Sequence, residues 1–323
     1  MPAPSLYDTY ARTIRIELAD DERERERALR ARFAEFWSSA GGDLRATYDT
    51  FIATCPLADG CTVEQVAEDR VGGWWVRPAA APAGQAILYL HGGGYVLGSA
   101  AAYRGFASQI ASRTGLAVLA IDYPLAPEAT LPAAPNAALA AWRWLRAHGI
   151  DHVAIAGDSA GGGLALAALS DIGRVGTGPA PVAGVVFSPW TDLAFTGRSM
   201  TDPAIEDPLI GHDYLRDCAA KVLGAADPYH PLASPLFADK RRLPPLLIQV
   251  GTDERLLDDA RAYAGLAAAA RVPVTLEIWE GMHHVFQLDV AHLESSRHAL
   301  DRAADFLRRA FAARHTPIDT ATI

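Results

Sequence analysis

The stretch Gly157-Asp158-Ser159-Ala160-Gly161 determines how the rest of the chain is interpreted. It follows the apolar run Val153–Ala156 and opens an alanine- and leucine-rich segment, which is the strand–turn–helix context of a G-x-S-x-G nucleophile elbow. A serine at so sharp a turn has strained backbone geometry, so the residues two before and two after it must be nearly free of side chain. The turn would expose the Ser159 hydroxyl at a helix N-terminus, where the dipole favours developing negative charge. We therefore expect Ser159 to be a nucleophile and Asp158 to fix the turn by hydrogen bonding.

Short apolar runs alternate with helical segments along most of the chain. Such runs are typical of strands buried on both faces of a parallel sheet, and the alternation predicts a doubly wound α/β fold. A hairpin is expected at Cys61–Val66 and Trp74–Arg77, with its turn at Gly72-Gly73. The expected strands of the sheet are Ala86–Leu90, Ala117–Ile121, Val153–Ala156, Gly184–Phe187, Leu246–Val250 and Val274–Trp279, and the expected helices include Asn136–His148, Ala160–Ser170 and Leu293–Phe311.

Two segments lie outside this alternation and predict a cap. In residues 1–50, apolar side chains recur at helical spacing (Leu29, Phe33, Phe36 and Trp37), and we interpret the surrounding charges as a solvated helix face. We expect residues 1–50 to form a helical cap segment over a catalytic domain of residues 51–323. Residues 192–230, with a helix around Tyr214–Leu223, are expected to be an insertion that contributes to the cap. The residues from about His315 are predicted to be disordered.

The composition narrows the class of protein. A length of 323 residues suits one large α/β domain with an accessory element, and the net charge of −9 argues against a nucleic-acid partner. No apolar run approaches the roughly 20 residues that span a bilayer, and no secretion signal is recognised, so a soluble cytoplasmic protein is expected. Its cysteines, Cys55, Cys61 and Cys218, lack metal-ligand spacing, and free thiols are favoured over a Cys55–Cys61 bridge.

A glycine-rich stretch, His91-Gly92-Gly93-Gly94-Tyr95, directly follows the expected strand Ala86–Leu90. Acyl transfer creates an alkoxide that needs backbone N–H donors, and glycines let the backbone approach it closely. A phosphate cradle is disfavoured because no Lys-Ser/Thr follows and no dinucleotide spacing is present. We expect the oxyanion donors to be the N–H groups of Gly93, Gly94 and Ala160.

The base and its orienting acid should follow two later strands, in the order Ser, Asp, His. Asp253 follows the run Leu246–Val250, and a pair of histidines, His283 and His284, follows Val274–Trp279. Asp253 would hold the imidazole tautomer and stabilise the imidazolium. Its nearby rivals are Glu254, Asp258 and Asp259, for which capping and surface roles are favoured. Local chemistry alone does not choose between the two histidines.

These motifs together resemble the bacterial hormone-sensitive-lipase-like esterases of the α/β-hydrolase superfamily. The resemblance covers about residues 61–311, and its last motif reads Gly-Met-x-His, which implies that His284 is the base. Two residues depart from the family pattern: Pro124 stands where Arg is usual, and Gly163 stands where Asn is frequent. The resemblance also implies a helical cap, and a homodimer through the last strand and helix. The motifs that carry it are His91–Tyr95, Asp122–Glu128, Gly157–Gly162, Gly251–Asp253 and Gly281–Phe286.

The expected activity is hydrolysis of short- to medium-chain carboxylic esters by Ser159, His284 and Asp253 through an acyl-enzyme, as in a carboxylesterase, with no metal or organic cofactor. The substrate would be a small-molecule ester. Lactone hydrolysis by the same residues is the first alternative, and a catalytically inactive small-molecule-binding fold is the second.

Overall fold

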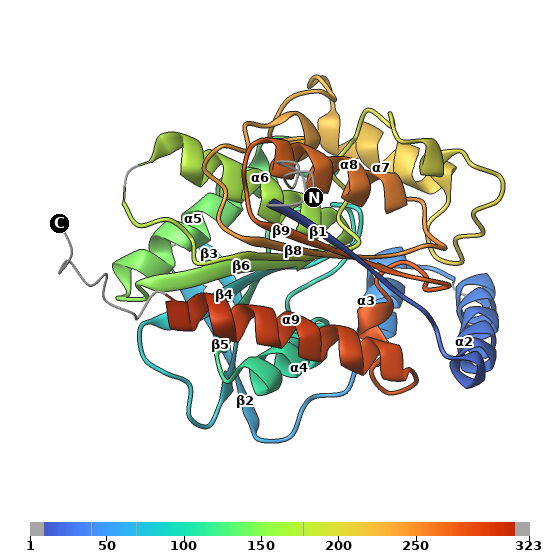
Figure 1. The fold of residues 1–323 in the computed structure, drawn as a ribbon, viewed down its shortest axis with the longest axis horizontal. Coiled ribbons are helices and arrows are strands. Elements are labelled where there is room, and N and C mark those ends of the chain that lie inside the picture. The colour runs from blue at the N-terminus through green and yellow to red at the C-terminus, as the bar shows by residue number, and fades with distance from the viewer. Residues whose placement is uncertain (1–9, 40, 69, 177, 314–323) are drawn as a thin grey trace, which may run out of the picture.

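A twisted sheet forms the centre of the structure (Figure 1). The structure is a computed structural model that describes residues 10–39, 41–68, 70–176 and 178–313. The described strands follow the order β1-β9-β8-β7-β6-β4-β5-β3-β2. Neighbouring strands are parallel except in the pairs β2–β3 and β3–β5, so the predicted mostly parallel sheet is confirmed. The strands are β1 (Ala11–Ile16), β2 (Cys61–Glu68), β3 (Val71–Pro78), β4 (Gln85–Leu90), β5 (Ala117–Ile121), β6 (His152–Asp158), β7 (Gly184–Phe187), β8 (Leu246–Gly251) and β9 (Val274–Trp279).

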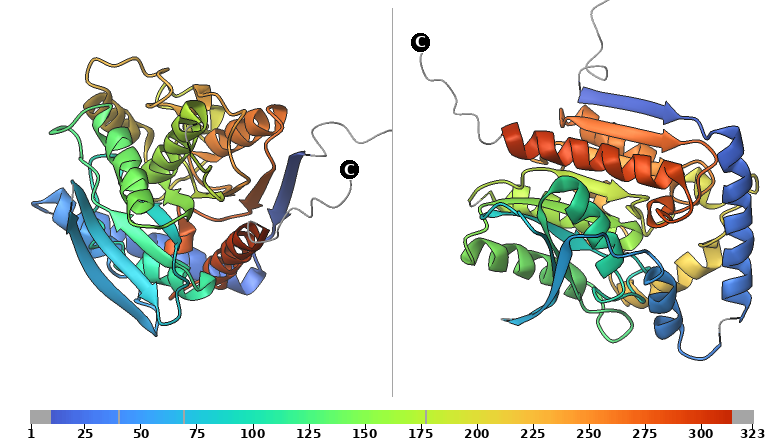
Figure 2. Two further views of the ribbon diagram at one scale, coloured as in Figure 1. Left: turned by 90° about the vertical axis from the view of Figure 1, so that its left-hand side faces the viewer. Right: turned by 90° about the horizontal axis from the view of Figure 1, so that it is seen from below.

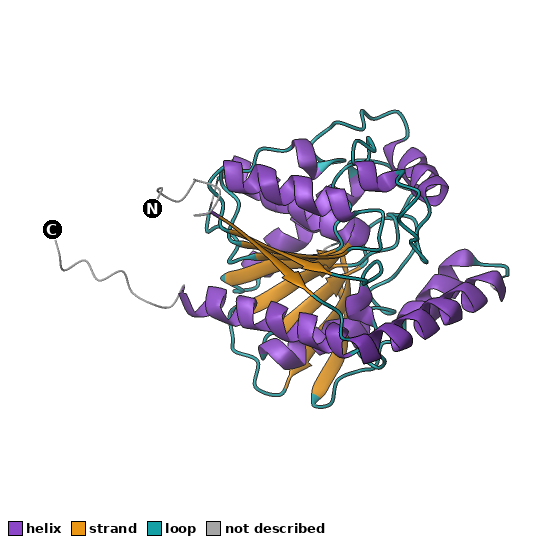
Figure 3. Cartoon of the chain, turned by 45° about the vertical axis from the view of Figure 1, so that its right-hand side comes forward, coloured by secondary structure: helices purple, strands orange, loops and turns teal. Residues whose placement is uncertain are grey.

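Helices cover both faces of the sheet (Figure 3). One face packs against α5, α6, α7 and α8, and the opposite face packs against α4 and α9, so that each face has its own apolar core (Figure 1). The longer helices are α2 (Asp20–Ser39), α3 (Leu44–Ile52), α4 (Arg104–Thr114), α5 (Ala133–Ala147), α6 (Ser159–Val175), α7 (His212–Leu223), α8 (Leu257–Ala269) and α9 (Glu294–Ala313). The short 3-10 turns are η1 (Arg198–Met200), η2 (Pro235–Phe237) and η3 (Phe286–Leu288).

The central strands are the short apolar runs that the sequence predicts. Five consecutive residues of β4, Ala86–Leu90, have no exposed surface, because helices cover both of its faces. Burying one such Leu or Ile side chain contributes about 1.5–3 kcal/mol, so these strands hold the two helical layers together.

The hairpin β2–β3 is present, but its turn is not at the two glycines. The strands are joined between Glu68 and Val71, and Gly72 and Gly73 lie inside β3. A Cβ atom at Gly73 would lie 2.1 Å from the Ala120 backbone oxygen. The glycine therefore permits close approach of β3 to β5 instead of forming the turn.

The N-terminal segment contains a strand as well as helices. β1 pairs in parallel with β9 along its whole length, an element that the sequence analysis does not predict. This position bears on the homodimer that the family resemblance implies. Because β8 and β1 occupy the two sides of β9, a strand from a second subunit would have to pair with β1 rather than with β9. α2 follows β1 and stands across the carboxyl ends of the strands, as the right-hand view of Figure 2 shows.

Other expectations have mixed outcomes. The helix expected around Tyr214–Leu223 is α7, and the three cysteines are free thiols, as favoured. No helix in the described ranges is long and apolar enough to cross a membrane. The residues from His315 onward, predicted to be disordered, lie outside the described part of the chain. The division of the chain into a cap segment and a catalytic domain stays a prediction.

Candidate active site

The motif residues meet at the carboxyl end of the sheet. Ser159 directly follows β6, the glycine-rich loop follows β4, and the loops after β8 and β9 carry the acids and the histidine pair. These strands lie in the order β9-β8-β7-β6-β4, with β7 between the serine and the acids. Parallel strands place their carboxyl ends on one edge of a sheet, which is where α/β folds build sites.

Ser159 occupies a strained elbow. Its φ angle is +53°, in the left-handed region that residues other than glycine rarely adopt. A Cβ atom at Gly157 would lie 2.4 Å from the Gly161 backbone oxygen, and one at Gly161 would lie 2.1 Å from the Leu90 backbone oxygen. The two glycines are therefore needed for the steric reason inferred from the sequence.

His284 contacts the serine. Its Nε2 lies 2.9 Å from Ser159 Oγ, and its Nδ1 lies 2.8 Å from Glu254 Oε2. These partners select the tautomer in which Nδ1–H donates to the carboxylate and Nε2 accepts from the serine hydroxyl. Burial alone would lower the pKa of His284, but the hydrogen bond to Glu254 and the negative charge of that carboxylate raise it.

The neighbouring His283 turns away from the serine. Its ring is fully buried between two carboxylates, with Nδ1 2.9 Å from Glu26 Oε1 and Nε2 2.9 Å from Asp289 Oδ2. The structure thus separates the two histidines that local sequence chemistry left undecided.

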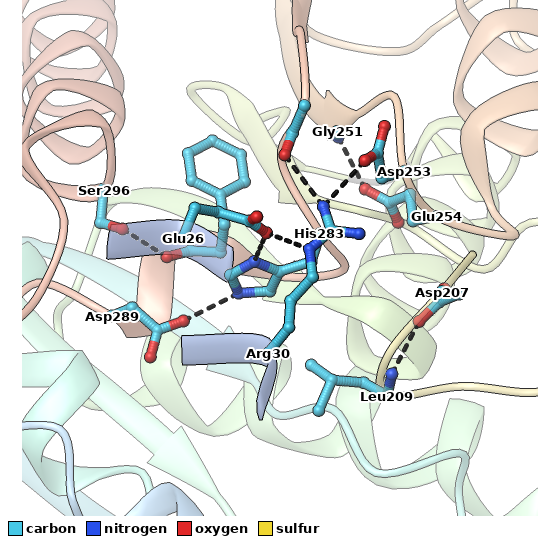
Figure 4. A network of polar contacts seen from close by, with 12 residues as sticks. Glu26, Arg30, Asp207, Leu209, Gly251, Asp253, Glu254, His283, Asp289 and Ser296 are labelled. Atoms are coloured by element: carbon cyan, nitrogen blue, oxygen red, sulfur yellow. Dashed lines mark hydrogen bonds and ion pairs between the residues drawn. The ribbon is translucent and has the colours of Figure 1, made fainter. Parts of the chain in front are cut away.

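The expected contact between Asp253 and His284 is corrected by the structure. The carboxylate beside the imidazole belongs to Glu254, which is fully buried. Asp253 has a side chain that is 39% exposed, and its Oδ2 lies 2.8 Å from Arg30 Nη2. The two acids are adjacent, but Glu254 contacts His284 whereas Asp253 contacts Arg30 of α2. Figure 4 shows the two acids together with Arg30. Nothing in the residue types distinguishes them.

Ser188, at the end of β7, is a polar contributor that sequence reasoning missed. Its hydroxyl donates to Glu254 Oε1 at 2.8 Å and accepts from the Val285 backbone N–H at 3.0 Å. The Gly251 N–H donates to the same Glu254 oxygen at 2.7 Å. Ser188 therefore joins the loop that carries the acid to the loop that carries His284.

The glycine-rich loop is fastened to the elbow by Asp158. One oxygen of this buried carboxyl accepts from the Gly92 N–H at 3.0 Å and from the Tyr89 hydroxyl at 2.5 Å, and the other accepts from the Tyr103 hydroxyl at 2.9 Å. Burial raises the pKa of Asp158 to about 6, although these hydrogen bonds oppose the shift. Asp158 thus acts through hydrogen bonds, as inferred from the sequence, but these bonds join the elbow to the glycine-rich loop and to two tyrosines.

The expected oxyanion donors border the serine. Gly93 and Gly94 line the cavity that contains Ser159 and His284, with positive φ angles of +111° and +63°. Within the described part of the chain, no hydrogen bond engages their N–H groups. Ala160 is the second residue of α6, and N–H groups in the first turn of a helix lack acceptors within it.

Comparison with known proteins identifies the family. A family model described as alpha/beta hydrolase fold matches residues 87–288. An esterase of the bacterial hormone-sensitive lipase family has a similar structure, with a TM-score of 0.84 at 41% identity over 91% of this chain and 99% of that one. The chain belongs to the bacterial hormone-sensitive-lipase-like family of α/β hydrolases.

Two curated relatives of this hydrolase agree on the class of enzyme. An acetyl-hydrolase of Streptomyces hygroscopicus is 47% identical over 238 residues, which are 73% of this chain and 79% of the relative. An esterase of Acinetobacter venetianus is 36% identical over 231 residues, which are 71% and 76% of the two chains. The hydrolase is therefore an enzyme of the carboxylesterase type.

The hydrolase encloses its serine in a mostly apolar cavity of about 320 Å³. Residues of α2, α3 and the segment around α7 line this cavity, so both segments that the sequence analysis assigns to a cap border it. The lining residues from these three elements are Phe33, Trp37, Leu44, Tyr48, Phe51, Ile52, Leu209, Ile210, Tyr214 and Leu215.

Of the two departures from the family pattern, Gly163 has a local explanation in the structure, whereas no contact among the described residues explains Pro124. Glu128, in the loop that carries Pro124, pairs with Arg45 of α3. Arg45 Nη2 lies 2.7 Å from Glu128 Oε2 and donates to the Ala126 carbonyl at 2.9 Å. A Cβ atom at Gly163 would lie 1.9 Å from the Trp190 backbone oxygen. Gly163 is thus required by the packing of α6 against the loop after β7.

Proposed function

We propose that this esterase hydrolyses short- to medium-chain acyl esters through an acyl-enzyme, with Ser159 as nucleophile, His284 as base and Glu254 as orienting acid. The observation that carries the proposal is the position of His284, whose two ring nitrogens lie 2.9 Å from Ser159 Oγ and 2.8 Å from Glu254 Oε2. A base held between a nucleophile and a buried carboxylate is the arrangement that activates a serine.

The first half-reaction forms the acyl-enzyme. Ser159 Oγ attacks the ester carbonyl carbon while His284 Nε2 takes the hydroxyl proton, and Glu254 stabilises the resulting imidazolium. The N–H groups of Gly93, Gly94 and Ala160 hold the negative carbonyl oxygen of the tetrahedral intermediate. The carbon–oxygen bond to the alcohol then breaks, and the alcohol leaves with the proton from His284 Nε2. In the second half-reaction water replaces the alcohol and releases the acid.

The size of the cavity supports a small acyl group. Its volume of about 320 Å³ lies near the lower end of the roughly 300–1,000 Å³ usual for ligand pockets. The relative from Streptomyces hygroscopicus is named an acetyl-hydrolase, which agrees with this size class.

The test is a series of p-nitrophenyl esters from acetyl to palmitoyl, with wild type and Ser159→Ala measured side by side. Rates that peak at short or medium chains and fall on the order of 10⁴-fold or more in the variant would support the proposal. A rate optimum at palmitoyl would overturn the substrate class. Absence of ester hydrolysis, with hydrolysis of an ε-lactone of equal carbon number, would replace the reaction by lactone cleavage.

A further inference from the structure

His283 lies in a charged cluster that the proposed reaction does not use. Its ring is fully buried and has a carboxylate at each nitrogen, Glu26 on α2 and Asp289 beyond η3, both at 2.9 Å (Figure 4). A neutral imidazole has one donor and one acceptor, so it would point a lone pair at one of the two carboxylates. Only the imidazolium donates to both.

The electrostatics agree with this geometry. Burial alone would lower the pKa of His283, but the hydrogen bonds to Asp289 and Glu26 raise it to about 9. Within the described residues, the charged groups around the ring are Glu26 and Arg30 on α2 and Asp289 on the following loop. At neutral pH the ring is therefore a cation that holds two anions together.

The cluster connects α2 to both loops that bear site residues. Arg30 Nε lies 2.5 Å from Glu26 Oε1. Arg30 Nη2 donates to Asp253 Oδ2 at 2.8 Å and to the Gly281 carbonyl at 3.0 Å. Asp253 precedes the acid that contacts His284, and Gly281 begins the loop that carries His283. One turn of α2 is thus bound to the acid loop and to the base loop at once.

The same turn of α2 positions the wall of the cavity. Phe33 follows Arg30 by three residues, packs edge-on against the His283 ring with centroids 5.2 Å apart, and lines the cavity that contains Ser159. Phe33 and Trp37 both contact Phe51 of α3, which lines the cavity as well. A shift of α2 away from His283 would therefore move the aromatic wall and enlarge the space opposite the serine.

We propose that the His283 imidazolium, clamped between Glu26 and Asp289, is a positioning residue that holds α2 and its Phe33 wall over the cavity and thereby limits the length of the acyl chain. This inference rests on the proposed esterase function and adds a determinant of its acyl selectivity. His283 touches neither the serine nor the reacting atoms, so it acts through α2.

The experiment compares wild type, His283→Gln and Glu26→Gln on ethyl acetate, ethyl butyrate and ethyl octanoate in a pH-stat. Asp21→Asn, which removes an exposed ion pair with Arg25 on the same helix, is the matched control. The clamp predicts that both cluster variants increase the ratio of kcat/KM for ethyl octanoate to kcat/KM for ethyl butyrate on the order of 10-fold. This is the discrimination that a pocket achieves for about one methylene group. The control should keep the wild-type ratio.

A pH series separates a charged clamp from ordinary packing. Between about pH 7 and about pH 10, on either side of a pKa of about 9, the wild-type ratio should move toward that of His283→Gln, which should itself stay constant. The proposal is overturned if the octanoate-to-butyrate ratio is the same in wild type and in both cluster variants. It is also overturned if the ratio of His283→Gln changes with pH as much as the ratio of wild type does.

Hydrogen exchange of residues 20–38 provides a readout that needs no activity. Corrected for intrinsic rates, protection of this segment should fall in wild type over the same pH range and be low throughout in His283→Gln. If wild type hydrolyses no ester, the proposed function fails while this measurement still decides the clamp. If protection of this segment in wild type does not change with pH, the clamp is refuted even if esters are hydrolysed. Because this comparison uses wild type alone, it decides the question even if the variants do not fold.

Discussion

Replacing Glu254 by glutamine should nearly abolish hydrolysis, whereas replacing its neighbour Asp253 by asparagine should not. In the structure one Glu254 oxygen accepts from Ser188 Oγ and Gly251 N–H, and the other accepts from His284 Nδ1. The side-chain amide that the substitution introduces has one accepting oxygen, and the two donors on the first side will hold it there. The NH2 group of that amide then faces His284 Nδ1 and forces the proton onto Nε2, which can no longer accept from the serine.

The expected loss follows from this change of tautomer. Holding the base in the wrong tautomer costs on the order of 10⁴-fold in kcat for the Ser-His-Asp triad. That factor corresponds to about 5.5 kcal/mol of transition-state free energy. Asp253→Asn breaks an ion pair with Arg30 whose side chains are 39% and 20% exposed. Partly exposed pairs contribute about 0–1 kcal/mol, so the loss should stay below roughly tenfold.

The assay is kcat and KM on p-nitrophenyl butyrate for wild type and the two variants, with thermal unfolding as a check that each protein is folded. A folded Glu254→Gln enzyme that keeps more than about a tenth of wild-type kcat would show that this carboxylate does not set the tautomer. A larger loss in Asp253→Asn than in Glu254→Gln would restore the assignment made from the sequence.

Three further predictions concern the same site. The proposed mechanism needs neutral His284, and Glu254 raises the pKa of this residue, so kcat/KM should increase with pH with a midpoint above about 6.5. The residual activity of Glu254→Gln should have its midpoint at lower pH. Gly161→Ala should lower the free energy of unfolding by about 1–3 kcal/mol in a denaturant titration, because the new Cβ would lie 2.1 Å from a backbone oxygen. Gly72→Ala, which has open space around the Cβ, is the control and should leave the titration midpoint unchanged. Asp158→Ala removes the acceptor of three buried donors, each of which costs about 1–3 kcal/mol when unpaired, so the unfolding temperature and kcat should fall together. An unchanged kcat would show that the glycine-rich loop does not depend on this anchor.

The sequence predicts the centre of the sheet well and its edge poorly. β4 and β5 are recognisable because strands covered on both faces must be apolar at every position. β1 reads Ala-Arg-Thr-Ile-Arg-Ile, and half of its six residues are exposed, so its sequence carries little sign of a strand. Among the described strands its partner is β9, which lies more than 250 residues away in the chain. Such a pairing depends on the completed fold rather than on local propensity.

The acid position was not predictable for a different reason. Asp253 and Glu254 both follow β8 and have the same chemistry, so only the path of the backbone decides which of them faces His284. Ser188 carries no motif at all. Its role arises because β7 ends beside β8, where the Ser188 hydroxyl contacts both Glu254 after β8 and the Val285 N–H after β9. Motifs therefore locate the site, while the strand ends determine which side chains meet in it.

The charges of α2 show why a helical charge run need not be a solvated face. Glu22 and Glu26 are one turn apart and almost fully buried, which corrects the solvated interpretation for this side of the helix. Glu22 accepts from the backbone N–H and the hydroxyl of Ser295, and Glu26 accepts from His283 and Arg30. A buried carboxylate without such partners is costly, so rotating or sliding α2 would leave both acids unpaired. The two acids thus fix the register in which α2 packs, and the apolar residues of the same helix need only fill the space that this register leaves.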